Sequence, residues 1–253
     1  MSVPKKIFIV PYRNRHTHRL NFVNRMNEYL KEETDWEIYF AHQCDERPFN
    51  RGAMKNIGFI AAKTKYPRDY GDITFIFHDV DTWPATNGII NYDTSDGIVK
   101  HYYGYEFALG GMFSIKGKDF EKTLGFPNFW GWGLEDNVIQ DRCKASNLII
   151  DRSNFFPISD KINIHREDDG AKRLVSKADV SVYKWEKPDN ITDIRDLNYK
   201  IENDMINITK FNVKMNVEDQ DFYIRDNSKE GTLLKIPKGY RRKNWSMAKI
   251  YNR

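Results

Sequence analysis

The amino-acid sequence predicts an α/β fold in which a Rossmann-like sheet is flanked by helices. Two observations predict it. Over residues 6–80, short apolar runs alternate with longer segments of helical periodicity, an order typical of a parallel sheet with crossover helices. Polar residues follow these apolar runs directly, and ligands of such sheets bind beyond the carboxyl ends of the strands.

The alternation begins near the N-terminus. KIFIVPY (6–12) is a short apolar run closed by a proline, which predicts a fully buried strand. The helix predicted over 19–33 places one set of side chains near one face: Leu20, Val23, Met26, Asn27 and Leu30. The elements that follow are a strand over 36–43, a helix over 51–65 and a strand over 72–80.

The second half of the chain continues the α/β pattern. The predicted elements are a strand over 110–115, helices over 118–125 and 134–146, and a strand over 147–151. After about residue 216 the sequence becomes polar and rich in turn residues. We therefore expect one catalytic-type domain over 1–216 and a C-terminal extension over 217–253, packed on that domain and without an assigned role.

The composition limits the classes of function. A chain of 253 residues fits one large domain, and its formal net charge of +4 is too small to predict a nucleic-acid partner. Two cysteines, Cys44 and Cys143, do not make a disulfide framework. The apolar run before Pro11 is too short for a signal peptide or a membrane span, so we expect a soluble protein that is not exported.

Asp79 and Asp81 follow the apolar run FIF (75–77). Two acids at i and i+2 lie on one face of a strand, and where the chain turns both can converge on one cation. Oxygen ligands suit Mg²⁺ or Mn²⁺, and such an ion can neutralise a diphosphate. An isolated DxD triplet is common on exposed turns, but acids at the end of a buried strand need partners. The position therefore favours a metal site.

The segment GFPNFWGWGLEDN (125–137) combines glycines, large aromatic residues and two acids. A tryptophan can stack on the apolar face of a pyranose, and an adjacent acid can accept a hydroxyl proton as general base. The alternative is a tryptophan-rich core hairpin with capping acids. For Trp130 we favour the core, and for Trp132, Glu135 and Asp136 together we favour a sugar site.

Arginines mark two other predicted ligand positions. Arg13 and Arg15 follow the first strand, and Arg51 begins a predicted helix, where backbone amides also favour anions. Each arginine alone is more often a solvated surface residue, but their shared position favours phosphate binding. His165 is the best candidate metal ligand among the histidines, and His78 is expected to be structural.

The ordered motifs PYRNR, FNRG, DVD, GGMFSI and FPNFWGWGLEDN, followed by His165, resemble the β-1,4-galactosyltransferase family (glycosyltransferase family 7). The similarity spans about residues 5–216. It implies a GT-A fold with a mixed sheet and a metal-dependent, inverting, UDP-sugar-dependent hexosyltransferase. The implied product is a β-1,4 linkage between Gal or GalNAc and a sugar acceptor, free or on a glycoconjugate.

The resemblance also implies roles for matching residues. Asp136 is the expected base, with Glu135 and Trp132 as the other catalytic residues. Asp81 and His165 are the expected ligands of Mn²⁺, with Mg²⁺ as the alternative ion and Asn163 as a further candidate ligand. The implied donor-binding residues are Pro11, Arg13, Arg15, Phe49, Arg51, Asp79, Val80, Ala108, Gly110, Gly111 and Trp132.

The chain departs from the family pattern in three places. Leu134 and Asn137 replace a glycine and an acid, so the acceptor cannot be copied from relatives. A Met or His metal ligand expected upstream of His165 is missing, and Asn163 could ligate only through its amide oxygen. Ala108 stands where strict galactosyl members have tyrosine, which predicts that UDP-GalNAc is accepted at least as well as UDP-Gal.

Two other functions stay open. A catalytically silent carbohydrate- or UDP-sugar-binding protein would explain the missing ligand, although Asp81, His165 and Asp136 together favour an enzyme. A nucleic-acid module rests only on the basic C-terminal residues and is the least supported. Animal members are anchored in the Golgi membrane, so the expected location is the Golgi lumen if this sequence is a piece of a longer protein, and the cytoplasm otherwise.

Overall fold

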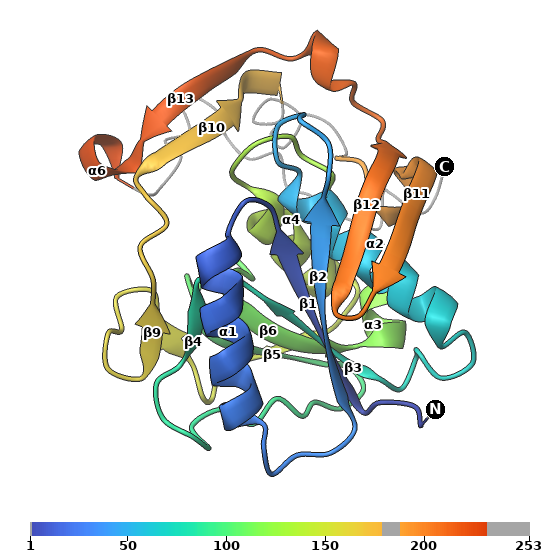
Figure 1. Cartoon of the computed structure of the whole chain (residues 1–253), viewed down its shortest axis with the longest axis vertical. Helices are drawn as coiled ribbons and strands as arrows, with labels where there is room; N and C mark the ends of the chain where they lie inside the picture. Colours follow the sequence, from blue (N-terminus) through green and yellow to red (C-terminus); the bar gives the residue numbers. More distant parts are fainter. Residues whose placement is uncertain (1, 179–187, 232–253) are drawn as a thin grey trace.

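A nine-stranded mixed sheet runs through the protein and carries helices on both faces (Figure 1). The computed structural model describes residues 2–178 and 188–231. Its strands are β1 (Lys6–Tyr12), β2 (Trp36–Gln43), β3 (Thr74–His78), β4 (Thr82–Pro84), β5 (Ile98–Gly104), β6 (Met112–Lys116), β7 (Ile149–Asp151), β8 (Phe156–Pro157), β9 (Ile164–Arg166), β10 (Lys172–Ser176), β11 (Arg195–Glu202), β12 (Met205–Asn212) and β13 (Phe222–Asp226). The helices are α1 (His16–Tyr29), α2 (Arg51–Lys65), α3 (Gly117–Lys122), α4 (Glu135–Ala145) and α6 (Asn227–Glu230), with 3₁₀ turns η1 (Ile191–Asp193) and η2 (Val217–Asp219).

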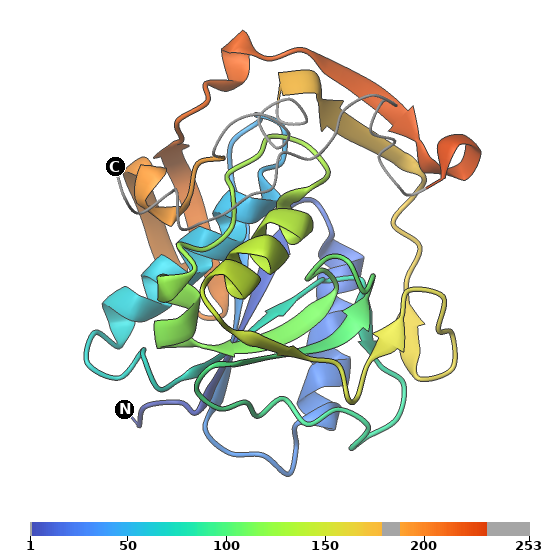
Figure 2. The ribbon, with the colours of Figure 1, turned by 180° about the vertical axis from the view of Figure 1, so that it is seen from behind.

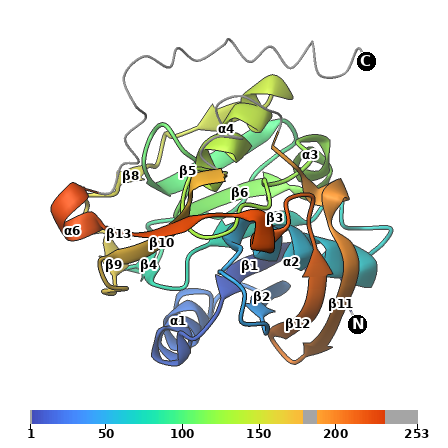
Figure 3. The same cartoon turned by 90° about the horizontal axis from the view of Figure 1, so that it is seen from above.

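The main sheet has the order β11-β12-β2-β1-β3-β6-β5-β7, and β8 also pairs with β5. β1 is parallel to both β2 and β3, whereas β6 is antiparallel to β3 and β5. The mixed Rossmann-like sheet expected from the sequence is therefore confirmed. Figure 3 shows α1 on one face of this sheet and α3 and α4 on the other.

Alternate side chains of β1 enter two separate cores. Ile7 and Ile9 pack with residues of α2, α3 and α4, and Phe8 and Val10 pack with residues of α1. All four side chains are completely buried. Because helices cover both faces of the sheet, its central strands are continuous apolar runs, which is the pattern that identified them in the sequence.

The boundaries and the buried face of α1 differ from the prediction over 19–33. The helix begins at His16 and ends at Tyr29. Leu20 is 45% exposed, whereas Phe22, Met26 and Leu30 are completely buried. The contact with the sheet follows this i, i+4, i+8 stripe, and Leu20 lies outside it.

Other predicted elements are present with shorter or shifted boundaries. The strands predicted over 72–80, 110–115 and 147–151 are β3, β6 and β7, and the helices predicted over 118–125 and 134–146 are α3 and α4. The prediction missed β5, the short strands and the β11–β12 hairpin. β5 carries Lys100 and His101 inside its run, which hides the apolar pattern.

Two small ribbons lie outside the main sheet. β4 pairs with β9, and β10 pairs with β13, both antiparallel. The β10–β13 ribbon lies beyond the carboxyl ends of β1 and β2, as seen from both sides in Figures 1 and 2. β13 and α6 belong to the predicted extension over 217–253, of which residues 232–253 lie outside the described residues. The boundary after residue 216 stays a prediction.

Within the described ranges, no helix has both the length and the apolar character that crossing a membrane requires.

Two histidines are buried in the interior. His78 is 0% exposed among the aromatic rings of Phe8, Phe22 and Tyr92, in agreement with the structural role expected for it. His101 is 1% exposed and lies on β5. Burial lowers the pKa of each imidazole to about 4, so both are neutral in the folded protein at neutral pH.

We predict that His101 contributes to acid destabilisation. The unfolded chain binds a proton at this histidine below about pH 6.5 and the folded chain does not, so the stabilisation is complete above pH 6.5 and is lost between about pH 6.5 and 4. The loss of unfolding free energy between pH 7.5 and 5, measured with urea, should be about 2 kcal/mol smaller in His101→Gln than in the wild type. Equal losses in both proteins would contradict this prediction.

Candidate active site

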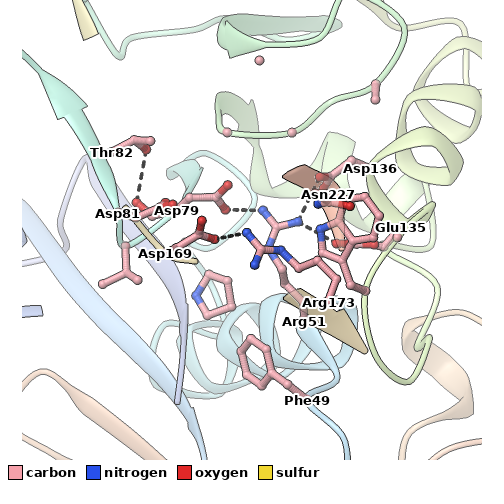
Figure 4. Close-up of a pocket in the computed structure, with 18 of the residues that line it drawn as sticks. Phe49, Arg51, Asp79, Asp81, Thr82, Glu135, Asp136, Asp169, Arg173 and Asn227 are labelled. Atoms are coloured by element: carbon pink, nitrogen blue, oxygen red, sulfur yellow. Dashed lines mark hydrogen bonds and ion pairs between the residues drawn. The ribbon is translucent and has the colours of Figure 1, made fainter. Parts of the chain in front are cut away.

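A cavity of about 910 Å³ lies beyond the carboxyl ends of β1 and β3 (Figure 4). Segments far apart in the sequence line it: residues 11–15 at the end of β1, 49–51 at the start of α2, 79–82 after β3, 103–111 before β6, and 131–137 at the start of α4. Residues of β9, β10 and α6 complete the wall. The cavity is at the edge of the sheet where the sequence predicts a ligand.

The structure brings most of the predicted site residues together. Those lining the cavity are Pro11, Arg13, Arg15, Phe49, Arg51, Asp79, Val80, Asp81, Ala108, Gly110, Gly111, Trp132, Glu135 and Asp136. His165 and Asn163 are not among the lining residues. Trp130, expected in the core, is 2% exposed and donates its Nε1 hydrogen to the Met215 carbonyl oxygen.

Arg51 occupies the centre of the site. Its Nη1 lies 2.6 Å from Glu135 Oε1 and 2.9 Å from Asp136 Oδ2, and its Nη2 pairs with Asp79 Oδ1. Figure 4 shows the guanidinium between Asp79 on one side and Glu135 and Asp136 on the other. Burial acts to lower the pKa of Arg51, but the three carboxylates more than offset this and raise it well above its ordinary value. The group is therefore always charged, and its donors already serve acids of the chain itself.

The carboxylate of Asp136, the expected base, has a second cation beside it. Lys55, one turn after Arg51 on α2, places Nζ 3.0 Å from Asp136 Oδ1. Burial raises the pKa of Asp136, and Arg51 and then Lys55 more than offset this, so the pKa lies below its ordinary value. The sequence prediction missed Lys55, and the available signal was its i, i+4 spacing from Arg51.

The diglycine segment is tied to the first turn of α4. The Leu109 amide donates to the Asp136 carbonyl oxygen at 2.9 Å. Gly111 has φ +70°, and a Cβ atom there would lie 2.5 Å from the Tyr103 carbonyl oxygen, so a side chain is excluded. His101 Nδ1 accepts from Arg152 Nε at 3.0 Å, so its Nε2 carries the hydrogen that points at the Gly110 carbonyl oxygen, also 3.0 Å away.

Backbone hydrogen bonds hold the Trp132 segment from two sides. The Gly131 amide donates to the Phe49 carbonyl oxygen at 3.0 Å, and the Trp132 amide donates to the Leu174 carbonyl oxygen at 2.7 Å. Gly131 has φ +82°, and a Cβ atom there would lie 2.6 Å from the Leu174 oxygen. The backbone at Trp132, which lines the cavity, is thus held between the segment before α2 and the β10–β13 ribbon.

Asp81 has the surroundings expected of a carboxylate that binds a cation. Asp79 and Asp169 lie beside it, as Figure 4 shows. Burial and the charges of these two acids raise the pKa of Asp81 to about 6. No ion pair of the described residues involves Asp81. The charge of Arg166 compensates these acids only in part. The oxygen donors and the remaining negative charge therefore fit a divalent cation.

His165 and Asn163 do not complete this set of ligands. The exposed imidazole of His165 stacks on Trp83 with ring centroids 4.6 Å apart. Asn163 donates its Nδ2 hydrogen to Asp160 Oδ2 at 3.0 Å. Across residues 2–178 and 188–231, no group of three or more His, Cys, Asp or Glu side chains is arranged to hold a metal ion. The metal-binding roles of His165 and Asn163 stay predictions.

A cationic wall of the cavity was missed by the sequence prediction. It consists of Arg166 on β9 and Lys172 and Arg173 on β10, with Asn227 of α6 beside them. Arg173 pairs with Asp169, and Arg15 donates to the Asp169 carbonyl oxygen at 3.0 Å. The charged run HREDDGAKR was the available signal, but only its histidine was assigned. Asn227 lies beyond the predicted domain boundary, so part of the extension lines the site.

Two family models match the chain. Residues 2–92 match the N-terminal region of glycosyl transferase group 7, and residues 98–166 match the N-terminal domain of galactosyltransferase.

Similar curated proteins are β-1,4-galactosyltransferases. The xylosylprotein 4-β-galactosyltransferase of Caenorhabditis elegans is 31% identical over 220 residues, which cover 79% of this chain and 73% of that protein. The β-1,4-galactosyltransferase 4 of Homo sapiens is 31% identical over 164 residues, which cover 60% of this chain and 46% of that protein. The chain spans about half the length of the mammalian β-1,4-galactosyltransferases 4 that it matches.

Solved structures show the same fold. The catalytic domain of Drosophila β-1,4-galactosyltransferase 7 in complex with xylobiose has a TM-score of 0.64 and 22% identity, covering 85% of this chain and 97% of that domain. A mutant of that enzyme in complex with manganese, UDP-Gal and xylobiose has the same TM-score of 0.64 and 21% identity. The GT-A fold expected from the sequence is confirmed by this likeness.

We predict that Arg51→Met is strongly destabilising, because it leaves three neighbouring carboxylates without their shared cation. The free energy of unfolding in urea should fall by about 3–5 kcal/mol. Arg19→Met is the matched control, since the side chains of Arg19 and Arg51 are 21% and 18% exposed and Arg19 pairs with the single carboxylate of Asp204. The control should lose about 1 kcal/mol, and equal losses would show that the shared ion pairs of Arg51 do not stabilise the site.

Proposed function

The chain belongs to glycosyl transferase group 7, the β-1,4-galactosyltransferase family, and on this premise we propose that it is a metal-dependent, inverting transferase. It would move Gal or GalNAc from a UDP-sugar to a hydroxyl group of an acceptor sugar and form a β-1,4 linkage. The observation that carries the proposal is the single cavity that unites Asp81, Trp132 and Asp136 with the predicted donor-binding residues.

Asp136 is the proposed general base. It lines the cavity, and its lowered pKa keeps the carboxylate ionised at neutral pH, so that it can accept the proton of the attacking hydroxyl group. A low pKa also makes a carboxylate a weak base. The position of Asp136 is therefore as important as its basicity, because transfer requires the acceptor hydroxyl and the anomeric carbon to be held in line.

The donor would lie between the cationic wall and the diglycine segment. Arg13 and Arg15 are the cations at the end of β1, and Arg13 also packs over the Phe49 ring at 5.2 Å. Lys172 adds a charge that the sequence prediction did not include. Charge-assisted hydrogen bonds from such groups would orient the diphosphate.

A divalent cation would be held by Asp81, with His165 as the second predicted ligand. When bound, the ion would neutralise charge that develops on the diphosphate as it leaves. At low pH, protons would compete with the ion for Asp81, whose pKa is raised to about 6.

The acceptor would stack on Trp132 and contact Glu135. Leu134 stands at the entrance to α4 with φ +72°, an uncommon backbone conformation for a branched side chain, and it lines the cavity. Its side chain packs with Phe129 and Val138. One similar protein is a xylosylprotein galactosyltransferase and another was solved in complex with xylobiose, so xylosides are the first acceptors to test.

A second candidate is a catalytically silent protein that binds a UDP-sugar or a carbohydrate. The observation that favours it is the absence, among the described residues, of a ready set of three metal ligands. The two candidates differ in UDP release, which should require Mn²⁺ and an acceptor in the enzyme and should be absent in the binding protein.

We predict that Asp136→Asn abolishes transfer and leaves UDP binding nearly intact. Loss of a general base should lower kcat by at least about a hundredfold. UDP binding should persist, because Arg13 and Arg15, the cations at the end of β1, bond to Arg47 and Asp169 and not to Asp136. UDP release and calorimetric binding of UDP with Mn²⁺ would be measured together. The control is Asp69→Asn at an exposed surface position, and loss of UDP binding in Asp136→Asn would indicate misfolding instead.

We predict that Ala108 admits the N-acetyl group of UDP-GalNAc. The residue is 5% exposed, lines the cavity and precedes the diglycine segment, so a small side chain there leaves room beside the donor sugar. The wild type should use UDP-GalNAc at least as well as UDP-Gal, and Ala108→Tyr should lower kcat/KM for UDP-GalNAc about tenfold relative to UDP-Gal. A wild-type preference for UDP-Gal of tenfold or more would overturn this assignment.

A further inference from the structure

Lys55 is a buried lysine for which the proposed reaction has so far no use. The residue is 1% exposed and lies in the middle of α2, among the buried residues Met54 and Ile57. An ammonium group is costly to bury unless it is paired, and an apolar side chain on this face of the helix would avoid that cost. The choice of lysine therefore needs an explanation.

The contacts of Lys55 connect it to one catalytic group. Its Nζ lies 3.0 Å from Asp136 Oδ1 and 4.5 Å from the centroid of the Phe126 ring. Arg51 lies 2.9 Å from the other oxygen, Asp136 Oδ2. Each oxygen of this carboxylate therefore has its own cation, and both cations come from α2.

The two cations are not equivalent. Arg51 also pairs with Asp79 and Glu135, whereas the only ion pair of Lys55 within the described part of the chain is with Asp136. Lys55 is also absent from the lining of the cavity, where Arg51 and Asp136 are both found. It lies behind the carboxylate and does not reach the ligand space.

We propose that Lys55 is a positioning residue for the transfer reaction, which fixes the orientation of the Asp136 carboxylate and supplies it with a dedicated counter-charge. The proposal rests on the proposed function of Asp136 as the base. A carboxylate held at both oxygens cannot rotate about its Cβ–Cγ bond, so its remaining lone pairs keep one direction toward the acceptor hydroxyl. Fixed geometry of this kind supplies a large part of the rate acceleration of a two-substrate reaction.

The charges around Asp136 come from four elements. Arg51 and Lys55 of α2 are positive, and Glu135 of α4 and Asp79 after β3 are negative. His101 of β5 also faces the group and is neutral, because burial lowers its pKa to about 4. Loss of Lys55 would leave Asp136 with only the shared charge of Arg51, and the pKa of its carboxyl would rise.

The test compares Lys55→Met, which keeps the length of the side chain, with Lys55→Arg, which keeps the charge. In Lys55→Met, kcat should fall about tenfold while KM for the UDP-sugar changes less than about twofold, because Lys55 does not line the donor site. The acid limb of the pH profile of kcat should move up by about one pH unit. It is measured at saturating Mn²⁺ and donor, so that protonation of Asp81 does not set the limb. Lys55→Arg should keep the acid limb of the wild type.

Lys65→Met is the matched control. Lys65 lies on the same helix and pairs with Glu37, far along α2 from the cavity, so its loss should leave kcat and the acid limb unchanged. If Lys55→Met does not fold, Lys55→Gln replaces it in the same measurements. An acid limb that stays in place, or an equal loss of kcat in Lys65→Met, would show that Lys55 is only structural.

A double-mutant cycle separates this inference from the proposed function. The loss of stability caused by Lys55→Met, measured in urea, should disappear when Asp136 is already Asn. A wild-type protein without any UDP-sugar turnover would overturn the proposed function, whatever the cycle shows. An active wild type in which the two substitutions act independently would overturn the role of Lys55 alone.

Discussion

The arrangement of the site depends on one guanidinium group that is shared by three acids. Arg51 joins Asp79, which follows β3, to Glu135 and Asp136, which begin α4. Like charges this close repel strongly in a partly buried site, and burial alone would force protons onto some of them. With a cation among them, a strand end and a helix start that are distant in sequence can meet at one edge of the sheet. Arg51 also helps to lower the pKa of Asp136, so this carboxylate stays ionised, as the proposed chemistry requires.

Helix α2, which carries Arg51, also supplies other polar groups that shape the cavity. Asn50 caps α2 through the Ala53 amide and donates to the Asn128 carbonyl oxygen at 2.9 Å. Asn56, one turn after the start of the helix, donates to the Phe126 carbonyl oxygen at 2.8 Å. The glycine- and tryptophan-rich segment is thus bound to α2 before it reaches α4. One face of α2 is buried in the core and carries, at its N-terminal end, the groups that orient both the sugar-binding segment and the base, so the site is positioned by a rigid element.

Local patterns in the sequence were sufficient for five strands of the sheet, β1, β2, β3, β6 and β7, and for the motifs that line most of the site. Asp79 follows an apolar strand and Asp136 follows a distinctive glycine- and tryptophan-rich segment, so each carries a signal within a few residues of itself. The local signal of Lys55 is only its i, i+4 spacing from Arg51, which does not identify its role, because a lysine inside a helix looks solvated until its partner, 81 residues away, is brought beside it. The β10–β13 ribbon was not predicted for a similar reason, since its short charged strands are far apart in the sequence and pair only in the folded chain. His165 is the reverse case: the family pattern assigns it to the metal, yet its ring stacks on Trp83 outside the cavity lining.

The balance of charge in the cavity explains why the proposed donor and cation suit it together. Most of its arginines are already engaged by the chain itself, as Arg51 is by three carboxylates and Arg173 is by Asp169. Asp81, by contrast, lies beside two other acids, and burial and these acids raise its pKa more than the charge of Arg166 lowers it. A diphosphate alone would bring more negative charge to this side, and a divalent cation alone would gain only part of its preferred oxygen ligands. A diphosphate that arrived with a divalent cation would be nearly neutral, would add oxygen ligands for the ion and would relieve the repulsion around Asp81. The proposed donor and cation are therefore expected to bind better together than either binds alone.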